Sequence, residues 1–160
     1  MQQLAELVRD LPVVDLQPDD VLVEEGQRTS AVFVLDHGAL AVTRGGMAIA
    51  EITTPGAFVG EIAALVGGDH SATVTATAPS RLWRADDGAA FLRSSPDLAI
   101  MVAIEVAHRL QGLVAYLADL KRQYDGAPGL DMVDGVLNRL AQQARKPVQP
   151  GSVREPDPLY

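Results

Sequence analysis

The residue types best suited to ligand chemistry lie in the stretch that begins at Gly60. This glycine precedes an apolar run, Glu61–Val66, that two further glycines close, and the pattern predicts a short helix. The leading N–H groups of so short a helix, at Glu61, Ile62 and Ala63, lack intrahelical acceptors and carry partial positive charge. Such N–H groups indicate a site for an anion.

Polar side chains flank this predicted helix. The carboxylate of Glu61 would repel a phosphate but can accept a hydrogen bond from a sugar hydroxyl. His70 offers a possible cation, and Ser71 and Thr73 offer two hydroxyls. A ligand with both a phosphate and a ribose fits this combination. Two structural alternatives remain open: Glu61 as an acid stabilised by the helix dipole, by at most ~1 kcal/mol, and Ser71 and Thr73 as ordinary strand residues.

Two neighbouring patterns carry a family resemblance. Phe58–Ala63 reads Phe-Val-Gly-Glu-Ile-Ala, and Ser71–Val74 reads Ser-Ala-Thr-Val, with His70 directly before it. Together they resemble the phosphate-binding cassette of the cyclic nucleotide-binding domain family, in which an arginine precedes the second pattern. The resemblance extends over about Val14–Arg122 and implies a non-enzymatic sensor of cAMP or cGMP.

The resemblance also implies roles for individual residues. The cassette from Gly60 would hold the cyclic phosphate through the N–H groups at the helix start, Ser71 and His70, with Thr73 beside them. Glu61 would accept a hydrogen bond from the ribose 2′-hydroxyl. The remaining implied contacts involve the base or the glutamate, and they come from Val42, Ala50, Arg109 and Leu113. Arg109 lies where relatives carry an arginine that can reach this glutamate.

Histidine in place of arginine is the main departure from the family pattern. Arginine offers a permanent charge and a bidentate fork, whereas a histidine with a pKa of ~6.5 is mostly neutral at pH 7. Loss of the fork would weaken binding by about one to two orders of magnitude. Asp69 and a bound phosphate would both favour an imidazolium at His70. Two interpretations therefore compete: weaker or pH-dependent nucleotide binding, or a degenerate interaction and dimerisation module without a ligand.

Composition limits the other possibilities. A chain of 160 residues with 48% hydrophobic and 4% aromatic residues predicts one globular domain with an aliphatic core. The net charge of −8 disfavours a nucleic-acid surface, and no cysteine is present for disulfides or thiolate metal sites. No metal spacing, nucleophile elbow or phosphate-binding lysine loop is visible, so we expect no enzyme and no metal cofactor. The apolar run Leu98–Ile104 is too short for a bilayer, and we expect a cytoplasmic protein without a membrane partner.

Short alternating runs separated by glycine turns predict a mainly β fold, an antiparallel jelly roll with flanking helices. The predicted strands are Val13–Leu16, Val21–Val23, Ala31–Leu35, Ala39–Thr43, Met47–Ile52, a strand through Ala72–Ala76, and Arg81–Ala85. The predicted helices are Met1–Asp10, Glu61–Val66, Asp86–Leu92 and a long helix that begins at Pro96.

The long helix carries a heptad seam. Its apolar positions alternate in steps of four and three, a pattern typical of pairing helices, at Val106, Leu110, Leu113, Leu117, Leu120 and Tyr124. The seam predicts a homodimer through the Val106–Tyr124 helix, as in catabolite activator-like relatives. The downstream protein that such a sensor would address is not identifiable from the sequence.

The remaining chain predicts three segments: a domain over residues 1–125, a hinge with a short amphipathic helix over 126–146, and a disordered, proline-containing tail over 147–160. Catabolite activator-like regulators continue at this point into a helix-turn-helix domain. The chain therefore resembles their sensory half.

Overall fold

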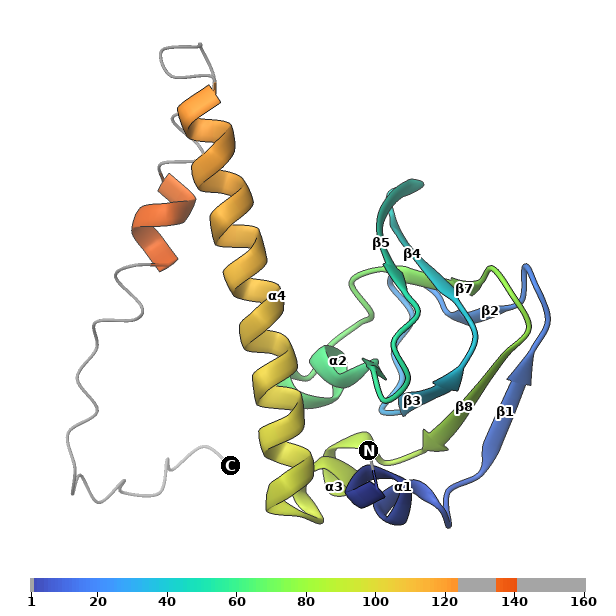
Figure 1. The fold of residues 1–160 in the computed structure, drawn as a ribbon. Helices are drawn as coiled ribbons and strands as arrows, with labels where there is room; N and C mark the ends of the chain where they lie inside the picture. Colours follow the sequence, from blue (N-terminus) through green and yellow to red (C-terminus); the bar gives the residue numbers. More distant parts are fainter. Residues whose placement is uncertain (1, 124–134, 141–160) are drawn as a thin grey trace, which may run out of the picture. The chain divides into compact units, whose positions relative to one another are not determined.

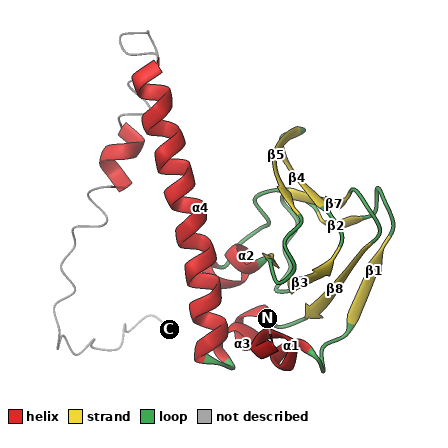
Figure 2. Ribbon diagram, in the orientation of Figure 1, coloured by secondary structure: helices red, strands yellow, loops and turns green. Residues whose placement is uncertain are grey.

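The computed structural model describes residues 2–123 and 135–140 (Figure 1). The chain divides into two compact units, residues 1–107 and 108–160. The first unit is a sandwich of two antiparallel sheets with helices packed on it (Figure 2). This architecture confirms the predicted jelly roll.

Eight strands form the two sheets. The first sheet has the order β1-β8-β3-β6 and the second the order β2-β7-β4-β5, with every pair antiparallel. The strands are β1 (Val13–Leu16), β2 (Val21–Val23), β3 (Val32–His37), β4 (Leu40–Arg44), β5 (Met47–Ile52), β6 (Phe58–Val59), β7 (Thr73–Ala76) and β8 (Ser80–Ala85).

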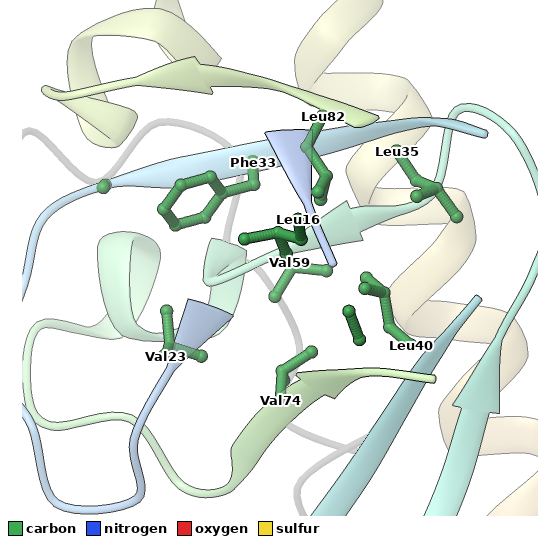
Figure 3. Close-up of a cluster of buried hydrophobic side chains, with 10 residues drawn as sticks. Leu16, Val23, Phe33, Leu35, Leu40, Val59, Val74 and Leu82 are labelled. Atoms are coloured by element: carbon green, nitrogen blue, oxygen red, sulfur yellow. The ribbon is translucent and has the colours of Figure 1, made fainter. Parts of the chain in front are cut away.

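Strand β3 is buried on both faces, which explains its continuous apolar sequence. Phe33 and Leu35 point between the sheets, toward Leu40 and Val74 of the opposite sheet (Figure 3). Ten residues form this inner core: Leu16, Val23, Ala31, Phe33, Leu35, Leu40, Val59, Val74, Ala76 and Leu82. The inner core is almost wholly aliphatic, as the composition predicts.

Alternate residues of the same strand pack against helices in a second buried group, the outer cluster. Its members are Leu4, Val8, Val32, Val34, Phe58, Leu92, Leu98 and Val102. They come from α1 (Gln2–Val8), β3, β6, α3 (Gly88–Arg93) and α4 (Pro96–Gln123). The outer cluster therefore anchors the first turns of α4 on the sandwich.

Local sequence signals set several of these boundaries. The Asp87 side chain accepts a hydrogen bond from the N–H of Ala90 at 2.9 Å and so caps α3. Proline at the first position suits the start of α4. Gly45 and Gly46 both adopt positive φ in the turn that joins β4 and β5 into a hairpin.

Strand β6 is the element that the sequence pattern misses. Phe58 and Val59 follow a glycine turn, and two residues are too few to show an alternation. Their strand conformation comes from pairing with β3, in which Val59 lies opposite Phe33 and Phe58 opposite Val34. Tertiary pairing, and not local pattern, creates this strand.

In the second unit, α4 continues to Gln123 and residues 135–140 are helical. Most of the predicted hinge and short amphipathic helix over 126–146 and all of the predicted tail over 147–160 lie outside the described residues, so the predicted domain limits stay predictions. Among the described residues, α4 is the one helix whose length and apolar composition would allow it to cross a bilayer. Its most apolar stretch of 18 residues is 11% buried, which leaves much of its apolar surface exposed.

Candidate functional site

The glycine that precedes α2 (Glu61–Val66) has a backbone that other residues rarely adopt. Gly60 has φ of +87° and its carbonyl accepts a hydrogen bond from the N–H of Ala64 at 3.1 Å. A Cβ at this position would lie 2.6 Å from the carbonyl oxygen of Ala31. The left-handed backbone and the close approach together require glycine here.

The first residues of α2 differ sharply in exposure. Glu61 is only 3% exposed, and Ala63 is also buried, whereas Ile62 is about half exposed. A buried carboxylate needs hydrogen-bond donors, because its transfer out of water is otherwise costly. This burial goes beyond the general preference of acids for helix starts.

Two predicted base-pocket residues lie opposite each other. In the pairing of β4 with β5, Val42 faces Ala50, and in the pairing of β4 with β7, Val42 faces Val74. Val42 is partly buried and packs on the inner core, whereas Ala50 is exposed. The sheet thus brings these two residues together, and their contact with a base stays a prediction.

The two predicted hydroxyl residues have different surroundings. Ser71 is exposed in the bend before β7. The hydroxyl of Thr73 accepts a hydrogen bond from the N–H of Glu25 at 2.9 Å, which links β7 to the loop after β2. Glu25 in turn accepts from the N–H of Gly45 at 2.8 Å. Thr73 therefore has a structural role whether or not it also meets a ligand.

His70 is buried, which the sequence did not reveal. The residue is 5% exposed, and its Nε2 lies 2.7 Å from Oγ1 of Thr29. Burial lowers the pKa of His70, and the nearby Asp69 carboxylate offsets this only in part. Asp69 favours an imidazolium, as expected, but burial outweighs its effect, so the ring is neutral near pH 7. Its contact with a ligand stays a prediction.

Thr29 is the site residue that sequence reasoning missed. It precedes His70 by 41 residues and lies in the loop between β2 and β3. A threonine in a polar loop carries no pattern that points to such a partner. Only the fold brings the two side chains together.

Two predicted site residues fall in the second unit. Arg109 and Leu113 lie on the exposed part of α4, and Leu113 is half exposed. Their predicted contacts with Glu61 and with a base therefore stay predictions. In the described part of the chain, no group of three acidic or histidine side chains is placed to hold a metal ion.

A separate hollow of about 310 Å³ lies beside α1 in the first unit. It is lined mainly by apolar groups, among them Leu4 and Trp83, and Asp36 also lines it. None of the predicted ligand residues lines this hollow. It is therefore distinct from the candidate site at α2.

The buried ring of His70 predicts a pH dependence of stability. Because its pKa is lower in the folded chain than in the unfolded chain, the unfolded chain binds the extra proton first on acidification. The contribution is complete above pH ~6.5 and is lost below it, by at most about 1.4 kcal/mol per pH unit. Urea unfolding at pH 7.5, 6.5 and 5.5 should show this slope. The slope should shrink in His70→Asn, and an equal slope in both proteins would contradict the assignment.

Comparison with known proteins places the fold. The family model described as the cyclic nucleotide-binding domain matches residues 13–93, just over half of the chain. The N-terminal domain of a transcriptional regulator from Streptomyces coelicolor A3(2) is 26% identical, with 70% of this chain and 84% of that chain covered, and a TM-score of 0.53.

Two further solved structures share the fold. The catabolite activator protein of Thermus thermophilus is 21% identical, with 89% of this chain and 84% of that chain covered, and a TM-score of 0.60. The CBD2 domain of PKAR bound to Sp-2Cl-cAMPS is 19% identical, with 75% and 78% covered, and a TM-score of 0.59. The matched family segment includes Gly60, Glu61 and the strand that follows them. The chain belongs to the cyclic nucleotide-binding domain family.

Proposed function

We propose that this chain is a non-enzymatic sensor module that binds cAMP or cGMP at the cassette Gly60–Val74. One observation carries the proposal: the family match spans a cassette whose Glu61 is buried directly behind a left-handed Gly60. The carboxylate of Glu61, at the start of this short helix, can accept a hydrogen bond from a hydroxyl of the ligand. A cyclic nucleotide carries that donor on its ribose.

In this proposal, each part of the ligand meets a different group. The phosphate lies against the N–H groups of Ile62 and Ala63 and the exposed hydroxyl of Ser71. The ribose hydroxyl donates to Glu61, and the base lies against apolar side chains such as Val42. Hydrogen bonds with a charged partner contribute about 1.5–3 kcal/mol each, so the bond to Glu61 and the bonds to the phosphate both contribute in this range.

The cassette is coupled to α4 within the first unit. The N–H of Phe58 donates to Oε2 of Glu105 at 3.3 Å, which connects β6 to α4 two residues before the cassette. On the other side of Gly60, Ala64 of α2 packs against the outer cluster that also contains Leu98 and Val102. Ligand binding at the cassette would therefore bias the position of α4, which is the output of a two-state sensor.

We also propose that α4 pairs with a second copy of the chain. Leu110 and Leu113 of the predicted seam are about half exposed, and the helix presents more apolar surface than the described residues cover. A heptad seam of this kind is buried by a partner helix. Such a dimer would let one sensor report to another, or to a downstream protein.

Sedimentation velocity tests the pairing. The chain should sediment as a dimer, and Leu113→Glu should convert it to a monomer, because a charge in the seam loses its apolar contacts. Gln111→Glu places the same charge at an exposed position of the same helix and should leave the dimer intact. A monomeric wild-type chain would contradict the proposal, and flotation with liposomes would instead assign the apolar helix to a membrane.

A second candidate is the degenerate module without a ligand. Two observations favour it: the ring of His70 is buried and neutral, and no lysine or arginine occurs between Arg44 and Arg81. A phosphate at the cassette would therefore meet no cationic side chain from this stretch. In that case the chain would act only through its helix surfaces.

Calorimetric titration with cAMP and with cGMP separates the two candidates. We expect saturable binding of one or both nucleotides, and at least about tenfold weaker binding in Glu61→Gln, because the amide loses the charge-assisted hydrogen bond. Glu51→Gln changes an exposed carboxylate of β5 and serves as the matched control. A folded wild-type chain that binds neither nucleotide would overturn the sensor proposal in favour of the degenerate module.

A further inference from the structure

One residue ties the loop after α2 to the loop after β2. The N–H of His70 donates to the carbonyl of Gln27 at 2.8 Å, and the N–H of Gly26 donates to the carbonyl of His70 at 2.8 Å. The side chain adds a third link, from Nε2 to Oγ1 of Thr29 at 2.7 Å. Two loops far apart in sequence are thus joined at a single buried point.

The same ring also lies against the start of α2. A Cβ added at Gly60 would be 3.4 Å from Cε1 of His70 and 2.6 Å from the carbonyl oxygen of Ala31. The start of α2 is therefore packed between the loop that carries Thr29 and the ring that Thr29 holds. A shift of the ring would change the position of Gly60 and of Glu61 beside it.

The acidic groups near the ring favour a cation, and burial of the ring opposes it. Asp69 is the acid that acts on it, and α2 contributes the buried Glu61. The loop after β2 carries Glu24, Glu25 and Arg28, all exposed. Because burial outweighs the attraction to Asp69, the ring enters this contact in its neutral form.

We propose that Thr29 is a positioning residue for the cassette: through the buried ring of His70 it fixes the loop before β7 against the start of α2. This inference rests on the proposed nucleotide site and identifies the residues that hold that site in position. His70 then has a structural role: its contacts with the loop after β2 fix the positions of Glu61 and Ser71, and the ligand contacts these two residues.

The tie predicts the sign of a pH effect on binding. A proton on the buried ring places a charge among Thr29, Gly60 and Ala31, which opposes the arrangement that the ligand needs. Nucleotide affinity should therefore fall as pH falls through the pKa of His70 in the folded chain, which burial holds below its usual range, by at most about tenfold per pH unit. A ring that contacted the phosphate as an imidazolium would give the opposite sign.

The test compares Thr29→Val with Thr29→Ser in the full 160-residue chain. The hydroxyl is removed in the first variant and kept in the second, so at pH 7.5 we expect about tenfold weaker nucleotide binding for valine and wild-type affinity for serine. Thr53→Val replaces an exposed threonine and controls for the substitution itself. Titrations at pH 5.5 should show a lower nucleotide affinity than at pH 7.5 for the wild type and for Thr29→Ser. The difference in affinity between the two pH values should be smaller for Thr29→Val.

Amide hydrogen exchange keeps the inference testable if a variant binds poorly for other reasons. The N–H groups of Gly26 and His70 should lose protection in Thr29→Val and keep it in Thr29→Ser. Wild-type affinity in Thr29→Val, or tighter wild-type binding at pH 5.5, would overturn the positioning role. If the wild type binds neither nucleotide, the proposed function is wrong, whatever the role of Thr29. Unchanged amide exchange at Gly60, Glu61 and His70 in Thr29→Val would show independently that Thr29 does not position the cassette.

Discussion

Replacement of Gly60 by alanine should abolish nucleotide binding and lower the free energy of unfolding by about 2–5 kcal/mol. Two costs add at this position. A left-handed backbone with φ of +87° is unfavourable for alanine, and the new Cβ would lie 2.6 Å from the backbone oxygen of Ala31. Because that oxygen belongs to the main chain, the clash can be relieved only by a shift of β3 or of the start of α2.

Gly46→Ala separates these two costs. Gly46 has φ of +78°, and a Cβ added there meets no atom within 4 Å. Gly46→Ala should therefore lower the free energy of unfolding only through the unfavourable backbone conformation, by about 1–2 kcal/mol, and should leave the cassette unchanged. Urea unfolding and calorimetric titration measure both effects. Equal destabilisation by the two substitutions, or nucleotide binding by Gly60→Ala, would contradict the account of the close approach.

Truncation of Leu98 to alanine should lower the free energy of unfolding by about 2–5 kcal/mol. Its side chain is fully buried in the outer cluster, where α4 meets α1, α3 and the first sheet. A cavity at that point would weaken the anchor of α4 and, through Ala64, the packing of α2. Nucleotide affinity should fall as well, since the cassette and α4 share this cluster.

Ile100→Ala is the matched control for this substitution. Ile100 lies two residues further along α4 and is 60% exposed, so its truncation should change stability by only about 0.5 kcal/mol. Thermal or urea unfolding of both variants gives the comparison. Similar losses for Leu98→Ala and Ile100→Ala would show that α4 is not anchored through its buried face.

Local periodicity and turn chemistry predicted most elements of the sandwich. Met47–Ile52 and Glu61–Val66 have the predicted bounds, because an alternating run and a glycine-bounded apolar run each carry a local signal. The hairpin at Gly45 and Gly46 follows from residues that tolerate positive φ. The two-residue strand β6 could not be predicted, since its conformation depends on β3 across the sheet.

The sequence suggests the residues of the candidate site, which stay a prediction, but it could not give the burial that sets the electrostatics of the site. Gly60 and Glu61 could be assigned from type and spacing, and the fold adds the close approach and the burial that explain them. The burial of His70 and its lowered pKa could not be predicted, because burial is a property of the fold. Its partner Thr29 is distant in sequence and has no pattern of its own.

Amide-resolved NMR of the wild-type chain during titration with cAMP and cGMP tests the central claim most directly. We expect the largest shifts at Gly60, Glu61, Ile62, Ala63 and Ser71, and smaller shifts along α4 near Glu105. Saturable shifts confined to the cassette and its connection to α4 would match the proposed site. Shifts that centre on another part of the sandwich, or no saturable shift with either nucleotide, would contradict it.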